Sequence, residues 1–369
     1  MTGIRRGAVP RVADPHGRMV AAYATPWFDQ AREVGVARTA QGRQGAWTID
    51  RPGRIRDLRW REAPLPEPEA GEVRIAVHAV GLNHHDLRVL AGAGAAPWPR
   101  IPGVDVVGRI EAIGEGVRGW RPGTRVMALL DPARCGGCAE SVLAPALALA
   151  PVPRGIDDIA AAGLPSAAFA AFHAIERRLQ PREGQSVIVF GASGGVGGFA
   201  VQLAAARGAH VLAVHSGHAR DHVLGLGASE ALDRSGGGIP DMVRALTDGR
   251  GADAILDVVG RAHAADCLAL LRPEGAIACV AGLPSLRRRE PLASALTLHE
   301  IAPAAAYRDT DPARLRDLAV VGRALLRRLA NGNLRPLTAE IFAFDAMPEA
   351  LLRLASGGAR GKIVARRSA

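Results

Sequence analysis

A glycine-rich turn between an apolar run and a helical segment gives this chain its clearest chemical signal. The apolar run covers 187–190, the turn covers 191–198, and the helical pattern continues to 207. Such a turn presents free backbone N–H groups and the positive end of a helix dipole to an anion. It therefore predicts a cradle for the pyrophosphate of a dinucleotide, although Ala192 takes the first glycine position of the G-x-G-x-x-G form. The expected contacts are Ser193, Gly194, Gly195, Val196 and Gly197.

The residues after the next apolar run indicate which dinucleotide is bound. Enzymes that prefer NAD place an acid about 20 residues past the glycines, where it binds the ribose 2′-hydroxyl. Here no acid occurs between 214 and 220. Ser216 could donate to a 2′-phosphate, Arg220 could pair with it as a charge-assisted fork, and His218 is a further candidate. This favours NADPH, with the alternative that Arg220 is simply a solvated residue early in a helix.

The turn lies within an alternation of apolar strands and helical segments that begins near residue 156. This spacing predicts a doubly wound parallel sheet with helices on both faces. Strands are expected over 186–190, 210–215, 254–259 and 276–281, and helices over 160–175, 199–207, 219–226, 241–247, 262–271 and 312–330.

Residues 46–149 have a different pattern, with short strands separated by glycine and proline turns. Strands are expected over 72–80, 106–113 and 124–129, which together predict a small, mostly β, barrel-like domain. Two late apolar strands, 340–344 and 362–365, could close back on it. The predicted fold class is therefore α/β, with one mostly-β domain and one parallel-sheet cofactor domain.

Composition excludes several classes of protein. The chain has 369 residues and a net charge of +10, and Lys362 is its only lysine. No apolar stretch reaches the roughly 18 residues of a membrane span, and four cysteines are too few for a disulfide framework. We therefore expect a cytoplasmic protein. Nucleic-acid binding is disfavoured because aromatic residues are scarce and acids are interleaved with the arginines.

The first 45 residues show no sustained periodicity. They predict a flexible extension with one short helix over 27–34, or alternatively a docking arm.

Several motifs in order resemble the medium-chain dehydrogenase/reductase superfamily. They are GEVRIAVHAVGLNHHDL, IPGVDVVGRIEAIGEGVRGWRPGTRVMAL, CGGCAESV, GLPSAAFAAFHAI, GASGGVGGFAVQLAAARGAHVLAV, GRGADAILDVVG and the closing GKIV. The resemblance implies a GroES-like catalytic domain over 46–163 that is completed by 306–369. It also implies a Rossmann domain over 164–305, a nicotinamide cofactor, hydride transfer and a homodimer.

Within that superfamily, the residues at the aligned zinc positions point to the zinc-free branch. Zinc alcohol dehydrogenases hold a catalytic ion with Cys, His and Cys, and this chain has Asn83, Val104 and Ser166 there. Only Cys135 and Cys138 stand where a structural zinc lobe needs four cysteines, so we read them as a turn, or as a redox pair. The expected relatives are quinone oxidoreductases and enoyl reductases, although the tyrosine that some enoyl reductase domains carry beyond the aspartate of GLNHHDL is missing.

The resemblance also places the remaining site residues. The nicotinamide would lie near the ends of two strands, at Val259, Gly260, Ala281 and Gly282. The opposite side of the cleft would come from Asn83, His84, His85 and Asp86. His85 could protonate the substrate, His84 could face the phosphates and Asp86 could fix the loop. The alternative is that both histidines are hydrogen-bonded loop residues without a proton role.

The predicted function is a zinc-independent, NADPH-dependent oxidoreductase. It would transfer hydride to a conjugated acceptor, either a quinone or an α,β-unsaturated carbonyl, including thioesters of coenzyme A or an acyl carrier. The alternatives are a zinc-free alcohol dehydrogenase-like enzyme and a non-catalytic NADPH-binding protein whose basic extension binds RNA or a protein partner.

Overall fold

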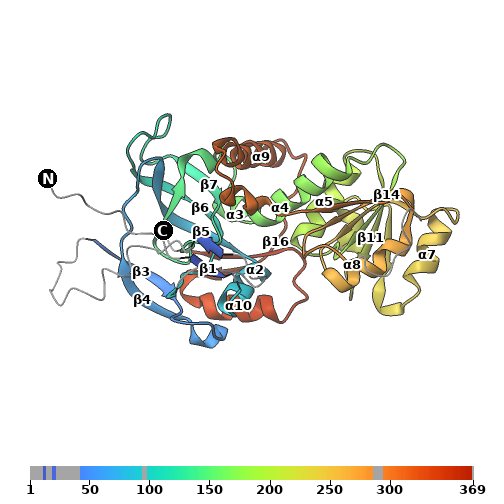
Figure 1. The fold of residues 1–369 in the computed structure, drawn as a ribbon, viewed down its shortest axis with the longest axis horizontal. Helices are drawn as coiled ribbons and strands as arrows, with labels where there is room; N and C mark the ends of the chain where they lie inside the picture. Colours follow the sequence, from blue (N-terminus) through green and yellow to red (C-terminus); the bar gives the residue numbers. More distant parts are fainter. Residues whose placement is uncertain (1–10, 14–18, 22–41, 94–97, 286–293, 368–369) are drawn as a thin grey trace.

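The computed structural model describes residues 11–13, 19–21, 42–93, 98–285 and 294–367 (Figure 1). Two large sheets dominate it, and they occupy opposite halves of the molecule in Figure 1. The helix expected over 27–34 lies outside the described residues. Within the first 45 residues, β1 (Arg11–Ala13) pairs antiparallel with β2 (Met19–Ala21). Residues 42–45 belong to a hairpin, because β3 (Arg43–Thr48) pairs with β4 (Arg59–Pro64).

The first large sheet contains the predicted β-rich region together with the end of the chain. Its strand order is β16-β17-β5-β6-β7-β9, and β8 pairs with β5. The strands are β5 (Glu72–Leu82), β6 (Asp105–Ile113), β7 (Arg125–Leu129), β8 (Ser141–Pro145), β9 (Ala150–Pro151), β16 (Thr338–Ala343) and β17 (Lys362–Arg366). The register of β17 against β5 sets Ile363 opposite Leu82. The late strands therefore close back on the early domain, and Lys362 lies beside the loop that follows β5.

The second sheet has the order β12-β11-β10-β13-β14-β15, and all its pairs are parallel. The strands are β10 (Ser186–Phe190), β11 (His210–His215), β12 (Glu230–Asp233), β13 (Ala252–Asp257), β14 (Leu271–Cys279) and β15 (Thr297–Glu300). This is the strand order 3-2-1-4-5-6 of a dinucleotide-binding fold, with its switch point between β10 and β13. The sequence predicted four of these strands, whereas β12 and β15 were missed because both are short and partly polar.

Helices cover both faces of the parallel sheet, because the right-handed crossovers from β10 to β11 and from β13 to β14 run in opposite directions. In Figure 1, α5 (Gly195–Ala205) lies on one face, and α7 (Ile239–Leu246) and α8 (Arg261–Cys267) lie on the other. The other α-helices of the described residues are α2 (His84–Leu90), α3 (Asp158–Ala162), α4 (Pro165–Phe172), α6 (Arg220–Gly225), α9 (Pro312–Ala330) and α10 (Met347–Ala355).

One predicted helix is divided in the structure. The segment expected as a single helix over 160–175 forms α3, then α4, then a π-helical segment His173–Leu179. Pro165 starts α4 because its fixed φ suits the first turn of a helix but not an interior position. The helix α10 was not predicted. No helix among the described ranges is both long and apolar enough to cross a bilayer.

Candidate functional site

The glycine turn joins β10 to α5, and its own packing requires small residues. Gly191 has a φ of +70°, and a Cβ on Gly197 would lie 2.2 Å from the Gly191 carbonyl oxygen. No side chain fits between these two backbones. The turn therefore leaves the N-terminus of an 11-residue helix open at the switch point of the sheet, which is where open α/β folds bind their ligands.

The expected nicotinamide floor lies at the same edge of the sheet. Asp257 and Cys279 are paired at the carboxyl ends of β13 and β14, so the segments that follow them, with Gly260 and Gly282, leave the sheet side by side. The buried Asp257 carboxylate accepts the Val259 N–H at 3.2 Å and the Gly260 N–H at 3.1 Å. These bonds fix the turn after β13 and leave the Val259 side chain half exposed, at 50 %.

A cavity of about 590 Å³ opens beside the glycine turn, between the end of β11 and helix α8. Ser216 lines it, and its contact with the adenosine end of a cofactor stays a prediction. His218 and Arg220 do not line it, and Arg220 donates instead to the Ala231 carbonyl oxygen at 3.2 Å. The cations that line the cavity are Arg234 and Arg244, which the sequence did not single out because they follow the unrecognised strand β12.

The loop between β5 and α2 is held by the Asp86 carboxylate. One of its oxygens accepts the Asn83 N–H at 2.8 Å, and the other accepts the Gly103 N–H at 3.1 Å. Burial and the negative charge of Asp105 raise the pKa of Asp86 to about 7, against the opposing effect of these two bonds. Asp86 thus fixes the loop, as expected, and its oxygens are turned to the backbone.

A buried cluster centred on Asp105 and Lys362 lies under this loop. Lys362 Nζ lies 3.2 Å from Asp105 Oδ2, donates to the Leu82 carbonyl oxygen at 3.0 Å and also donates to Asn83 Oδ1. Asn83 Nδ2 donates to the same Asp105 oxygen at 3.0 Å. The other Asp105 oxygen accepts the backbone N–H of Ser166 at 2.9 Å and its hydroxyl. Side-chain exposure is 5 % for Lys362 and 0 % for Asp105, so this is a fully desolvated ion pair.

Lys362 also reaches the cofactor cradle. A Cβ on Gly195 would lie 2.8 Å from Lys362 Cδ, so the lysine stem runs directly past the first residue of α5. One side chain therefore links the N-terminus of the cradle helix to the loop that carries Asn83. Neither Asp105 nor Lys362 was predicted as a site residue. One feature of the sequence could have pointed to Lys362, since it is the single lysine among 46 Lys and Arg residues.

The residues at the aligned zinc positions do not fit a zinc ion. Asn83 is an amide engaged with Asp105, Val104 is apolar and Ser166 donates its hydroxyl to the same carboxylate. The Lys362 ammonium stands beside them and repels a cation. Zinc sites use thiolate, imidazole or carboxylate donors, and these three residues offer none. The neighbouring Asp105 carboxylate already accepts hydrogen bonds from Lys362, Asn83 and Ser166.

Cys135 and Cys138 are not joined by a disulfide, and neither thiol is activated. Cys135 and Cys138 are both free, and Cys138 Sγ lies 3.7 Å from Met347 Sδ. Burial raises the pKa of the Cys135 thiol to about 11 and that of the Cys138 thiol well above its usual value. The pair therefore serves as a packed turn of small residues.

The two histidines of α2 have different surroundings. His84 is exposed, whereas His85 is half-buried and its Nε2 is buried without a hydrogen-bond partner. Burial lowers the pKa of His85, and the positive charges of Arg88 and Arg100 lower it further. The pKa of His84 is also lowered, because neighbouring groups shield part of its ring from water and because Lys362 and Arg88 are positively charged. Both imidazoles are therefore mostly neutral near pH 7.

Two family profiles match the two halves of this architecture. The profile described as "Alcohol dehydrogenase GroES-like domain" matches residues 69–154, and "Zinc-binding dehydrogenase" matches 195–308. The "NAD(P)H oxidoreductase RTN4IP1, mitochondrial" of Danio rerio is 32 % identical over 351 residues, with 86 % of this chain and 90 % of the relative covered. The chain belongs to the medium-chain dehydrogenase/reductase superfamily.

Two further proteins resemble the chain, one in sequence and one in fold. The "Quinone oxidoreductase" of Rattus norvegicus is 32 % identical over 219 residues, which cover 58 % of this chain and 66 % of that protein. The solved quinone oxidoreductase of Pseudomonas syringae pv. Tomato DC3000 shares the fold, with a TM-score of 0.80 at 23 % identity over 88 % of this chain and 99 % of that one. The protein is therefore an oxidoreductase with a GroES-like domain and a dinucleotide-binding domain, and quinone oxidoreductases are among its relatives.

Proposed function

We propose that this protein is an NADPH-dependent reductase that transfers hydride to a conjugated acceptor and works without zinc. The observation that carries the proposal is the buried Asp105–Lys362 pair. Asn83 and Ser166 stand at the positions where related dehydrogenases hold a metal, and both donate hydrogen bonds to Asp105 instead. Without a Lewis acid, the acceptor itself must be electron-poor. Quinones and α,β-unsaturated carbonyls, including thioesters of coenzyme A or an acyl carrier, meet that requirement.

The residues that would hold the cofactor line one continuous edge of the parallel sheet. The pyrophosphate would lie over Gly194–Gly197, the adenosine in the cavity lined by Ser216, and the nicotinamide over the turns at Gly260 and Gly282. When bound, the reduced nicotinamide supplies the hydride. Lys362 and Asp86 hold the loop of Asn83, His84 and His85, because Lys362 donates to the Leu82 carbonyl oxygen and Asp86 accepts the Asn83 N–H. This loop would face the bound nicotinamide.

The proposal that the cofactor is NADPH is supported by the cations of the adenosine cavity. A 2′-phosphate carries extra negative charge, and Arg234 and Arg244 line the cavity with Ser216. We expect Arg234→Ala to raise the KM for NADPH by about 10- to 100-fold and to change the KM for NADH by less than about 2-fold. Arg220→Ala is the matched control and should change neither much, because Arg220 is already engaged with Ala231. A larger effect of Arg220→Ala than of Arg234→Ala would refute this assignment.

His85 is proposed as the proton donor to substrates that cannot take a proton freely from water. Its pKa is lowered, so the protonated form is lost as pH rises through a value below 6.5. We therefore expect enone reduction to accelerate as pH falls from about 8 to 5, and expect His85→Ala to remove that rise and slow the reaction about 10²-fold. The rate of quinone reduction should change little with pH or with His85→Ala. His84→Ala is the matched control and should leave the pH dependence of enone reduction unchanged. Equal losses on both acceptor classes would leave His85 without a proton role.

The function as a whole is tested by following the oxidation of NADPH and NADH over a panel of quinones, enones, enoyl thioesters and simple ketones. The expected result is turnover of at least one conjugated class with NADPH, with no stimulation by added zinc. Turnover of simple alcohols or ketones alone, or activity that depends on zinc, would contradict the proposal. The same assay on a chain that lacks residues 1–41 tests the alternative in which the extension carries the function.

A further inference from the structure

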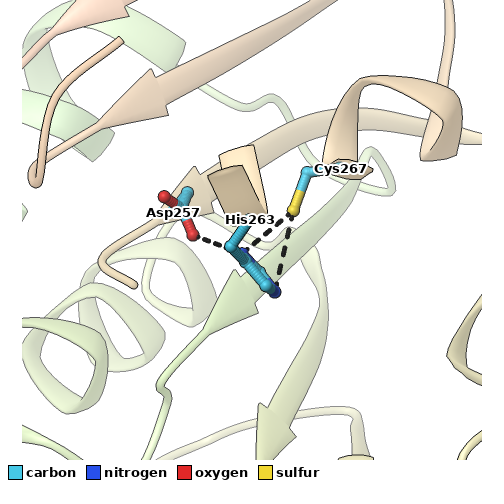
Figure 2. Close-up of side chains that lie close together, drawn as sticks. All are labelled: Asp257, His263 and Cys267. Atoms are coloured by element: carbon cyan, nitrogen blue, oxygen red, sulfur yellow. Dashed lines mark hydrogen bonds and ion pairs between the residues drawn. The ribbon is translucent and has the colours of Figure 1, made fainter. Parts of the chain in front are cut away.

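One imidazole on the wall of the 590 Å³ cavity, that of His263, is held in a fixed orientation. Figure 2 shows His263 and Cys267 on α8 and Asp257 at the end of β13. His263 Nδ1 lies 2.6 Å from Asp257 Oδ1 and 3.3 Å from Cys267 Sγ. The ring of Phe190 stands at 78° to the imidazole, with 4.5 Å between the two ring centroids. Contacts with three side chains therefore fix the His263 ring before any ligand enters.

Asp257 decides which nitrogen of His263 carries the hydrogen. Its carboxylate is fully buried and also accepts the Val259 N–H and the Gly260 N–H, so toward the ring it acts as an acceptor. The hydrogen of the neutral imidazole is therefore on Nδ1, and Nε2 keeps the free electron pair.

That electron pair is accessible to a ligand in the cavity. Nε2 is at the end of the ring away from Asp257 (Figure 2). The His263 side chain keeps 26 % of its surface exposed, whereas Asp257 and Cys267 are buried. Cys267 Sγ lies 4.0 Å from Nε2, and burial and the negative charge of Asp257 raise the pKa of this thiol, which leaves it a weak donor. A stronger donor on a ligand can therefore bind to Nε2.

The rest of the lining suits an adenosine phosphate. A phosphate needs cations, which Arg234 and Arg244 supply. A purine base has two apolar faces, and the cavity provides apolar side chains from α7 and from the segment after α8, namely Ile239, Pro240, Ala269 and Leu270. The donor on the edge of adenine is its exocyclic N6 amino group. A base packed among these apolar side chains needs an acceptor for that group on the cavity wall.

We propose that His263 Nε2 accepts a hydrogen bond from the N6 amino group of adenine when the cofactor occupies this cavity, an inference that rests on the proposed function. His263 is then the residue that selects adenine among purine bases. Asp257 is a positioning residue, because its carboxylate orients the imidazole and, through the Val259 and Gly260 N–H groups, the turn under the predicted nicotinamide.

A second strong acceptor in the lining is the Asp266 carboxylate. Asp266 is exposed, and its carboxylate has no hydrogen bond or ion pair with any residue that the structure describes. An exposed carboxylate exchanges water for the N–H of a ligand with little net gain, and its side chain must be ordered on binding. The His263 ring is already ordered. The geometry therefore favours His263.

Calorimetric titration of the full chain with two nucleotides tests this contact. The probes are ADP and purine riboside 5′-diphosphate, which has a hydrogen in place of the amino group. We expect the parent to bind ADP about 5- to 10-fold more tightly. His263→Phe should reduce this preference to less than about twofold. Asp257→Asn should also reduce it, because an amide no longer fixes the hydrogen on Nδ1. A purely structural loss would weaken both nucleotides alike and leave their ratio unchanged.

Asp266→Ala is the matched control and should keep the parental preference. A preference that persists in His263→Phe, or that disappears in Asp266→Ala, would overturn the proposal. An unchanged ratio in Asp257→Asn would remove Asp257 from its positioning role.

Comparing adenosine 2′,5′-bisphosphate with AMP separates this inference from the proposed function. If the 2′-phosphate adds no affinity while the ADP preference depends on His263, NADPH specificity is contradicted and the adenine contact stands. If the 2′-phosphate adds affinity without any preference for the amino group, only the adenine contact is refuted. A parent that binds none of these nucleotides would refute both.

Discussion

Lys362→Met is expected to lower the free energy of unfolding by about 3–5 kcal/mol, because it leaves the buried Asp105 carboxylate without its cation. The substitution also removes the donor that Asn83 Oδ1 and the Leu82 carbonyl oxygen share. Since Lys362 joins the Asn83 loop to the cradle helix, we further expect kcat/KM to fall about 10²-fold or more. Urea denaturation and steady-state kinetics with the best conjugated acceptor measure the two effects.

Two comparisons make this prediction specific. Arg366→Met changes an exposed cation on the same strand and should alter stability by no more than about 0.5 kcal/mol. The double variant Lys362→Met with Asp105→Leu removes both charges and should recover part of the lost stability but none of the lost activity. If Asp105→Leu instead lowered the stability of the Lys362→Met variant further, loss of the ion pair would not explain the destabilisation.

Gly197→Ala is expected to weaken NADPH binding about 10²-fold and to lower the free energy of unfolding by about 1–3 kcal/mol. The added methyl group would meet the Gly191 carbonyl oxygen at 2.2 Å, so the backbone of the cradle must move. Fluorescence titration with NADPH and thermal unfolding measure the two losses.

Substitutions at two other glycines distinguish an effect on stability from an effect on cofactor binding. Gly194→Ala brings its Cβ no closer than 3.4 Å to the Gly191 oxygen, so the fold should hold while cofactor affinity falls. Gly225→Ala in α6 meets no atom within 4 Å and should leave cofactor binding unchanged and stability unchanged or slightly higher. Normal NADPH affinity in Gly197→Ala would show that the pyrophosphate does not lie over this turn.

The parts of the site that the sequence predicts well are those built from neighbouring residues. The strand, turn and helix over 186–207 appear as β10 and α5, although α5 begins at Gly195, four residues earlier than the apolar pattern indicates. Turn chemistry and hydrophobic periodicity act over a few residues, so they can be read directly from the chain. The domain division and the roles of His84 and His85 stay predictions.

Other elements were missed for physical reasons that can be stated. The strands β12 and β15 have four residues each and lie beside exposed positions, so their apolar signal is too short to recognise. The expected contact of Arg220 with the cofactor phosphate stays a prediction, and the structure adds the neighbouring strand β12 to its surroundings. The structure shows that the Ala231 carbonyl oxygen of that strand accepts its guanidinium, while Arg234 lines the cavity.

The sequence by itself determined the family, the two kinds of sheet and the place of the glycine cradle, because each depends on motifs whose residues are close together in the chain. Only the tertiary structure decided what stands opposite the cradle. Lys362 and Asp105 are 257 residues apart, and they meet because β17 and β6 both pair antiparallel with the end of β5. A buried charge is stable only when a partner reaches it, and no local pattern reveals that partner.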